Sequence, residues 1–171
     1  MPKKFNYGLF VGRFQPFHKG HLHAIEFASS RCKTLLIGVG SSKDSGTKVN
    51  PLSADVRIKI IKAGLKGTKI KTKQLKFFEI PDFHNNEKWF NYINRRHPGI
   101  DVVFSHNELV ERIFKGHHIA VITPKWYKRK KLIASKIRYL IRHEKKWKDR
   151  VPKGSVKEIA AHESVIKHEE N

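Results

Sequence analysis

Cysteine is almost absent from this sequence, since Cys32 is the only one in 171 residues. A single cysteine forms no disulfide within the chain and supplies no cysteine-based zinc site. Long apolar runs are missing as well, because none approaches the roughly 20 residues that span a bilayer. The first residues, Met1 to Lys4, are not followed by the apolar core of a signal peptide. These absences lead us to expect a soluble cytoplasmic protein with no membrane partner.

Acidic residues are also scarce, with 15 Asp and Glu against 36 Lys and Arg and a formal net charge of +21. The excess is uneven. Residues 125–153 hold thirteen basic and two acidic side chains, a net +11, and residues 62–76 add six lysines and no acid. A field of this sign favours anionic partners such as nucleotides, nucleic acid or anionic lipid. It says nothing about the fold.

The apolar content is enough for a globular core, with 39% hydrophobic and 11% aromatic residues, and we expect a single domain over residues 1–171. Apolar runs that are typical of strands alternate with helical patterns. The alternation predicts an α/β fold with a doubly wound, mostly parallel sheet of about five strands. The predicted strands are 7–11, 34–39, 75–80, 102–105 and 119–123. Helices are predicted at 22–29, after an N-cap at Ser53, at 86–95 and at 108–114. C-terminal helices follow from about residue 132, at 135–143 and 156–166, and a polar tail begins at about residue 167.

The group of residues best suited to chemistry follows the first predicted strand. That strand ends at Gly12 and the next helix begins near Gly20, so the loop between them lies at the carboxyl end of the sheet, where open α/β sheets bind ligands. His18 and His21 can turn toward one point, and the helix N-terminus is expected to add N–H donors for phosphate. The residues alone leave zinc binding or a solvated helix end as alternatives for this histidine pair.

The whole segment 12–21 reads G-R-F-Q-P-F-H-K-G-H. Placed between a strand and a helix, it resembles the signature of the HxGH nucleotidyltransferase superfamily, and most closely the archaeal-type nicotinamide-nucleotide adenylyltransferases. The resemblance runs from Gly8 to about Ala160. It includes Gly40-Ser41-Ser42, Asn50-Pro51-Leu52 with Arg57, Pro81-Asp82-Phe83, Ser105-His106-Asn107, residues 132–138, and Trp147 with Val151-Pro152.

The resemblance implies a Rossmann-like nucleotidyltransferase fold and one reaction. The 5′-phosphate of nicotinamide mononucleotide attacks the α-phosphorus of ATP, and NAD and pyrophosphate are formed. The attacking phosphate is already ionised, so no general base is required. Catalysis then depends on positioning and on stabilising the charge of the phosphates. The candidate loops agree, because they are rich in His, Arg and Ser and contain no obvious carboxylate pair.

Roles at the ATP end follow from the resemblance. His18 and His21 are expected to contact the triphosphate, with His21 at the α-phosphate, and Arg13 to bridge the phosphates of both substrates. Arg138 is expected to hold the β- and γ-phosphates, although a solvated basic helix face is the alternative, and Ser135 to act as helix N-cap or phosphate donor. Mg²⁺ is expected to come with ATP, held by phosphates and water without protein ligands. The remaining residues expected to bind ATP are Gly12, Phe14, Gln15, Gly20, Gly40 and Ser41.

The second signature departs from the family pattern. That pattern is close to I-S-G-T-x-x-R, whereas residues 132–138 read L-I-A-S-K-I-R. Ile133 replaces a hydroxyl and Ala134 replaces a glycine, so one phosphate donor is lost and the backbone approach is tighter. We expect a changed phosphate affinity or nucleotide preference, with Lys136 or the basic run 128–131 compensating by charge.

For the second substrate, Trp89 is expected to stack on the pyridinium ring, a contact of about 0.5–2 kcal/mol. Asn86, one helical turn earlier, is expected to bind the carboxamide. Trp126 and Tyr127 form a second aromatic pair that is expected to line the pocket. The alternative for Trp89 is ordinary core packing at helical spacing.

Other functions remain open from the sequence. Within the superfamily the rivals are pantetheine-phosphate adenylyltransferase and the cytidylyltransferases, and the latter typically carry G-T-F-D where this chain has G-R-F-Q. In another class, a nucleic-acid-binding protein on this scaffold would use the basic and aromatic residues of 125–153, and an enzyme that also contacts RNA non-specifically fits equally. The resemblance suggests a homo-oligomer, which a charge of +21 on each subunit would oppose.

Overall fold

The structure is a computed structural model that describes residues 4–168. Its centre is a five-stranded sheet in the order β3-β2-β1-β4-β5, with every neighbouring pair parallel. The strands are β1 (Phe5–Gly12), β2 (Cys32–Val39), β3 (Leu75–Glu79), β4 (Val102–Phe104) and β5 (Ala120–Ile122). They are joined by α1 (Lys19–Ser29), α2 (Ala54–Leu65), α3 (Asn86–Arg96) and α4 (Glu108–Gly116). The predicted doubly wound α/β fold is confirmed.

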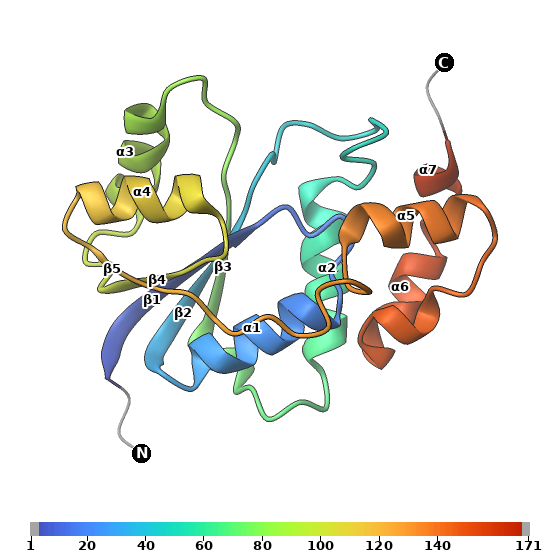
Figure 1. Ribbon diagram of the computed structural model, residues 1–171, viewed down its shortest axis with the longest axis horizontal. Coiled ribbons are helices and arrows are strands. Elements are labelled where there is room, and N and C mark those ends of the chain that lie inside the picture. The colour runs from blue at the N-terminus through green and yellow to red at the C-terminus, as the bar shows by residue number, and fades with distance from the viewer. Residues whose placement is uncertain (1–3, 169–171) are drawn as a thin grey trace.

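Successive strand residues point to opposite faces of the sheet, and each face has its own apolar cluster. Phe10 and Ile37 belong to the cluster under α1, α2 and the C-terminal helices. Leu9 and Leu36, their neighbours in sequence, belong to the smaller cluster under α3 and α4. Figure 1 shows the same division, with α3 and α4 together on one side of the sheet. Strands buried on both faces in this way read as continuous apolar runs.

The chain reverses direction across the sheet between β1 and β4. It builds β2 and β3 outward from β1 and then returns to place β4 on the other side of β1. Phe10 of β1 is therefore paired with Ile37 on one side and with Phe104 on the other. The loops after β1 and β4 leave the sheet at this switch point, where open α/β folds bind their ligands.

The C-terminal segment packs against α2. Ser155, in a 3₁₀ turn at Lys153–Ser155, donates a hydrogen bond to the carbonyl of Ile60 at 2.9 Å. The approach is close, because a Cβ added at Gly154 would collide with the carbonyl oxygen of Ala63. The segment consists of α5 (Ala134–Arg142), a 3₁₀ turn at Lys148–Arg150, α6 (Val156–Ala160) and α7 (Glu163–Lys167).

The single helix predicted over residues 156–166 is wrong, because α6 and α7 are separated at His162. The ring Nδ1 of His162 is hydrogen-bonded to the carbonyl of Glu158 at 2.8 Å, which is the acceptor that its backbone N–H would use in a continuous helix. The backbone N–H turns to Ile159 instead. A side chain thus competes with the helical ladder and ends it. Across residues 4–168 the structure contains no helix with both the length and the apolar character of a membrane span.

Candidate functional site

A cavity of about 550 Å³ opens at the switch point. Its walls come from the end of β1 and the following loop, the first turns of α1, the loop after β4, the loop after β5 and the start of α5. Eleven of the residues predicted from the sequence line it: Gly12, Arg13, Phe14, Gln15, His18, Gly20, His21, Trp126, Tyr127, Ser135 and Arg138.

The two histidines of the first signature hold each other in place. Their rings are stacked with centroids 3.6 Å apart. His18 is the N-cap of α1, and its Nδ1 accepts the N–H groups of Gly20 at 3.1 Å and His21 at 3.3 Å. The Nδ1 of His21 accepts the N–H of His18 at 3.2 Å. Because each Nδ1 is an acceptor, a neutral ring carries its proton on Nε2, and the pair offers two Nε2–H donors.

This arrangement corrects one expectation. The backbone N–H groups of Gly20 and His21, which we expected to be donors for phosphate, are bonded to the ring of His18. The donors that His18 and His21 retain are their imidazole Nε2–H groups. Zinc binding is not favoured either, since no group of three or more His, Cys, Asp or Glu side chains within residues 4–168 is arranged to hold a metal ion.

Both histidines are neutral over the physiological range. Burial lowers the pKa of His18 from 6.5 to about 4. Burial, followed by the nearby His18 and His106, lowers the pKa of His21 well below 6.5. Removal from water disfavours the charged ring, whereas a bound phosphate would favour it. The positive charge of the unliganded site therefore comes from arginine.

Phe14 and Gln15 support the histidines from within the protein. Gln15 is 2% exposed. Its Nε2 donates to the carbonyl of Leu52 at 2.8 Å, and its Oε1 accepts the N–H of Leu52 at 3.0 Å. Phe14 lies in the left-handed region with φ of 52° and directs its ring against His21, 4.9 Å between centroids. The Gln15 side chain thus anchors the loop at Leu52, and its predicted contact with ATP stays a prediction.

Arg138 projects from α5 into the buried side of the cavity. It is 8% exposed, and its Nη1 donates to the carbonyl of Gln15 at 2.7 Å. Its Nε is buried without a partner among the described residues. Burial first, and then Arg142 and Arg13, lower the pKa of Arg138 to about 10, so it remains a cation. The alternative of a solvated helix face is wrong for this arginine, because it is buried.

The predicted N-cap role of Ser135 is wrong. The N-cap of α5 is Ile133, which has extended backbone angles and whose carbonyl accepts the N–H of Ile137 at 3.0 Å. Ser135 is the second residue inside the helix. Its role as a phosphate donor stays a prediction, supported by its place in the cavity wall.

The lining of the cavity also contains residues to which the sequence assigned no role. His106 stacks on Trp126 with centroids 3.7 Å apart, and the Arg129 guanidinium lies 4.2 Å from the Trp126 ring centroid. Tyr127, expected to line the pocket, does so, as do Ser105 and Asn107. The signal for His106 was its place directly after the fourth strand. Nothing in the run 128–131 distinguished Arg129 from its basic neighbours.

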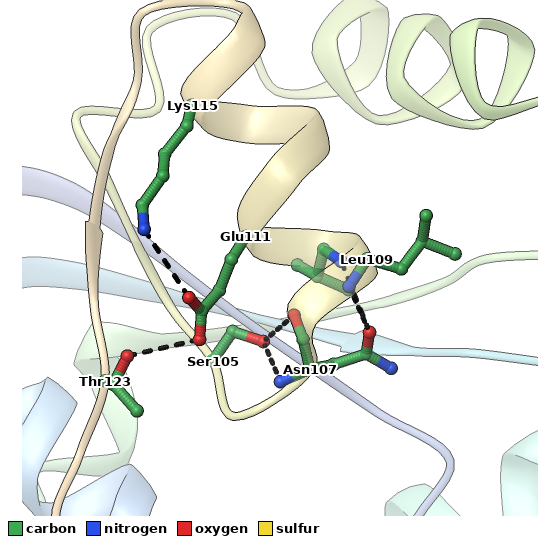
Figure 2. A network of polar contacts seen from close by, with 7 residues as sticks. Ser105, Asn107, Leu109, Glu111, Lys115 and Thr123 are labelled. Atoms are coloured by element: carbon green, nitrogen blue, oxygen red, sulfur yellow. Dashed lines mark hydrogen bonds and ion pairs between the residues drawn. The ribbon is translucent and has the colours of Figure 1, made fainter.

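The turn that carries His106 is fixed by the polar contacts drawn in Figure 2. Ser105 Oγ accepts the N–H of Asn107 at 2.9 Å, and Asn107 Oδ1 accepts the N–H of Leu109 at 2.9 Å and so caps α4. Glu111, on the next turn, accepts a hydrogen bond from Thr123 Oγ1 at 3.2 Å. These bonds tie the start of α4 to the chain after β5, on either side of the cavity wall.

Four predicted site residues do not line the cavity. Gly40 and Ser41 lie at the end of β2, where Ser41 donates to Asp82 Oδ1 at 3.0 Å. Asn86 is exposed at the start of α3. Trp89 meets the ring of Phe114 edge-on, 6.0 Å between centroids, a contact that fits the core-packing alternative. Ligand roles for these four residues stay predictions.

Comparison with known proteins places this geometry among nucleotidyltransferases. The cytidylyltransferase-like family model matches residues 9–152. A nicotinamide-nucleotide adenylyltransferase from Saccharolobus solfataricus is 39% identical over 152 residues, which make up 89% of this chain and 88% of that protein. The protein of the same name from Thermococcus onnurineus is 34% identical over 168 residues, covering 96% of this chain and 88% of the relative.

A solved structure resembles the fold closely. It is a bifunctional NMN adenylyltransferase/ADP ribose pyrophosphatase from Francisella tularensis, complexed with AMP and a manganese ion. The TM-score is 0.80 at 22% identity, and the match covers 95% of this chain and 51% of that one. The present chain thus spans about half the length of the bifunctional protein, and the likeness concerns the fold.

Proposed function

The chain belongs to the cytidylyltransferase-like family and groups there with the nicotinamide-nucleotide adenylyltransferases, and we propose that it transfers the adenylyl group of ATP to nicotinamide mononucleotide, giving NAD and pyrophosphate. The site itself contributes one observation above all. Two imidazoles fixed as Nε2–H donors and the buried Arg138 line one cavity at the switch point of the sheet. Such donors suit phosphates and the charge that develops on them.

The proposed reaction needs positioning more than acid–base chemistry. An ionised 5′-phosphate oxygen of the mononucleotide attacks the α-phosphorus of ATP, and the bond to the β-phosphate oxygen breaks as pyrophosphate leaves. His18 and His21 donate hydrogen bonds to the triphosphate, with His21 at the α-phosphate. Arg138 neutralises charge on the leaving pyrophosphate, and Arg13, exposed at the rim of the cavity, bridges the phosphates of the two substrates.

Magnesium enters this proposal as part of the substrate MgATP. The residues that line the cavity include no aspartate or glutamate, and Mg²⁺ prefers oxygen ligands. The ion is therefore coordinated by phosphate oxygens and water, and the protein's donors act on the remaining phosphate oxygens.

Trp126 is a candidate for binding the second substrate. Two groups contact the Trp126 ring, the stacked imidazole of His106 and the guanidinium of Arg129, and the side chain is still 53% exposed. A pyridinium ring is a cation like the guanidinium and is attracted to the same indole face, so the mononucleotide stacks there by displacing Arg129. Asn86 and Trp89 on α3 are the other candidates for this substrate.

A substrate panel tests the proposed function. The purified protein is incubated with MgATP and, separately, nicotinamide mononucleotide, nicotinic acid mononucleotide or phosphopantetheine, and the first two are repeated with CTP. We expect NAD and pyrophosphate to appear in equal amounts from the mononucleotide and MgATP. Turnover of phosphopantetheine or of CTP, without NAD formation, would refute the assignment.

We propose in addition that the exposed loop 125–131 contacts RNA non-specifically. All seven residues of this loop are exposed, and five of them are basic. Trp126 is 53% and Tyr127 37% exposed, which suits stacking with unpaired bases. Affinity for a labelled single-stranded RNA is expected to fall at least about 100-fold between roughly 50 and 200 mM salt. Undetectable binding at the lower salt would exclude the contact. Sedimentation of the same sample tests the expected homo-oligomer.

A further inference from the structure

A buried arginine ties together the ends of the two central strands. Arg57, in the first turns of α2, is 0% exposed. Its Nη1 donates to the carbonyl of Arg13 at 2.8 Å, after β1, and to the carbonyl of Gly40 at 2.7 Å, after β2. Its Nη2 donates to Ser41 O at 3.1 Å, and its Nε to Ser53 O at 3.2 Å. One guanidinium thereby holds three segments of chain.

The arrangement is energetically unusual. Arginine is almost never fully buried unless it is paired, and no carboxylate of the described residues forms an ion pair with Arg57. Burial lowers the pKa of Arg57, which the more distant Glu79, then Asp44 and Asp82, partly offset. Its partners are neutral carbonyls only. A buried cation without a counterion is retained at a cost, so the geometry that it enforces deserves a functional explanation.

The carbonyl of Arg13 supplies that explanation. The Arg13 side chain lines the cavity, and it makes no hydrogen bond or ion pair with other residues of the described chain. Among the described residues, the position of its own backbone is therefore the constraint on where this side chain begins. The preceding residue is fixed as well, because the N–H of Gly40 donates to the carbonyl of Gly12 at 2.9 Å. Both bonds connect the end of β1 to the end of β2, and Arg57 closes the connection.

We propose that Arg57 is a positioning residue for adenylyl transfer: it holds the peptide of Arg13 so that the Arg13 guanidinium reaches the phosphates. The inference rests on the proposed function, in which Arg13 bridges the two substrates. The proposal also assigns a role to the residues at the end of β2. Gly40 and Ser41 contribute their carbonyls to the clamp and thus act on ATP through Arg57 and Arg13.

A double-mutant cycle on ATP binding tests this coupling. Calorimetry gives the Kd of MgATP for the wild type, Arg13→Ala, Arg57→Lys and the double variant. Lysine keeps the charge but cannot reach all four carbonyls. We expect Arg57→Lys to weaken ATP binding about 10-fold in the wild type but less than about 3-fold in the Arg13→Ala background. Equal weakening in both backgrounds would overturn the proposal.

Steady-state kinetics separate positioning from a loss of folded protein. A purely structural defect lowers kcat in proportion to the folded fraction and leaves the KM for ATP unchanged. A misplaced Arg13 raises this KM and lowers kcat together. The two changes are expected to stand in the same proportion to each other as they do in Arg13→Ala. Arg57→Gln, which retains two N–H donors, is the second variant if Arg57→Lys does not fold. Wild-type Kd and KM in a folded Arg57→Gln protein would contradict the proposal.

Arg142 provides a matched control. It also clamps backbone carbonyls, with Nε donating to Ile166 O at 2.9 Å and Nη2 to Lys48 O at 2.7 Å, but it does not line the cavity. Arg142→Lys is expected to lower the free energy of unfolding and to leave the Kd of ATP within about 2-fold. The binding cycle needs no second substrate. A wild type that binds MgATP but forms no NAD would therefore refute the proposed function while the test of Arg57 remains valid.

Discussion

Two helices begin at the rim of the same cavity, and their N-termini are built in opposite ways. The first turn of α1 is capped by the buried His18, whose ring accepts two backbone N–H groups. The first turn of α5 follows Ile133, which is 44% exposed and makes no side-chain cap. Uncapped N–H groups at a helix start are a ready site for an anion. The α1 end thus presents imidazole donors, whereas the α5 end presents its backbone.

In the proposed reaction, this difference gives the two signatures different roles. The α1 side is neutral and directional, because burial keeps both histidines uncharged and the capping bonds set their tautomer. The α5 side is cationic, since it carries Arg138 and the positive end of the helix dipole. Directional donors suit the geometry of the α-phosphate, and diffuse positive charge suits the leaving pyrophosphate.

Removal of a fixed donor on the α1 side is expected to have the largest effect. His21→Ala deletes one of the two Nε2–H groups, and we expect kcat for NAD formation to fall about 1,000-fold, as for other preorganised donors to developing charge. His143→Ala is the control, because the His143 ring lies tilted against that of Tyr139 at the end of α5 and does not line the cavity. A His21→Ala enzyme with nearly wild-type kcat would contradict the role of α1.

On the α5 side, Arg138→Ala is expected to lower kcat/KM for ATP about 100-fold, since a charge-assisted contact to phosphate is lost. The carbonyl of Gln15 also loses its donor. Lys136→Ala, two residues away on the same helix, removes an exposed charge that does not line the cavity. If Lys136→Ala loses as much activity in the same assay, net charge rather than the placement of Arg138 determines the effect.

The stability of the protein at acid pH tests whether His18, at the start of α1, is buried in its neutral form. Because the pKa of His18 is about 4 in the folded protein and 6.5 in the unfolded chain, the unfolded chain binds more protons between these values. The contribution of neutral His18 to stability is therefore fully present above about pH 6.5. The free energy of unfolding is expected to fall by on the order of 3 kcal/mol as the pH drops to about 4. His21 contributes in the same direction.

Urea unfolding at about pH 7, 5.5 and 4.5 measures this loss. His18→Asn keeps an oxygen acceptor that suits the N-cap position but does not titrate, so its loss of stability across the same window should be smaller by the His18 contribution. Identical pH profiles for wild type and variant would show that His18 is solvated in the folded protein.

The fold was predictable because its signal is repeated along the chain. Each buried strand is an apolar run, and each connecting helix has its own spacing, so the order of elements was confirmed with boundaries shifted by a few residues. The exception is instructive. Ile159 and Ile166 are seven residues apart and both buried, which reads as one helix. The break depends on the ring of His162 bonding the carbonyl of Glu158, and periodicity carries no information about such a bond.

The site was predictable in position but not in the task of each side chain. The first signature identified the loop, yet only the structure shows that Gln15 turns to Leu52 while His18 turns to its own helix. Arg57 entered the sequence argument without a role, because an arginine is normally expected at the surface. Its burial depends on carbonyls from residues 13 and 40, and their convergence follows from strand order rather than from local sequence.

The smallest expected effect comes from making the α5 start resemble the α1 start. Ile133→Ser places a hydroxyl at the N-cap, where it can accept a first-turn N–H and raise the free energy of unfolding by about 1 kcal/mol. If the serine caps the helix in this way, fewer backbone donors remain for phosphate. If it donates to phosphate instead, as the family pattern implies, ATP binds about 3-fold more tightly, the gain of one modest hydrogen bond.

Urea unfolding and ATP calorimetry on Ile133→Ser separate these two results, with Ile133→Val as the control that leaves the cap empty. We expect the tighter Kd, because Ile133 lies in the cavity wall and is exposed there. A more stable protein with an unchanged or weaker Kd for ATP would mean that the backbone of α5 is the phosphate donor. In that case the two signatures are not interchangeable. The signature at α1 binds phosphate through side chains because its helix is capped, and the signature at α5 binds it through the backbone because its helix is not.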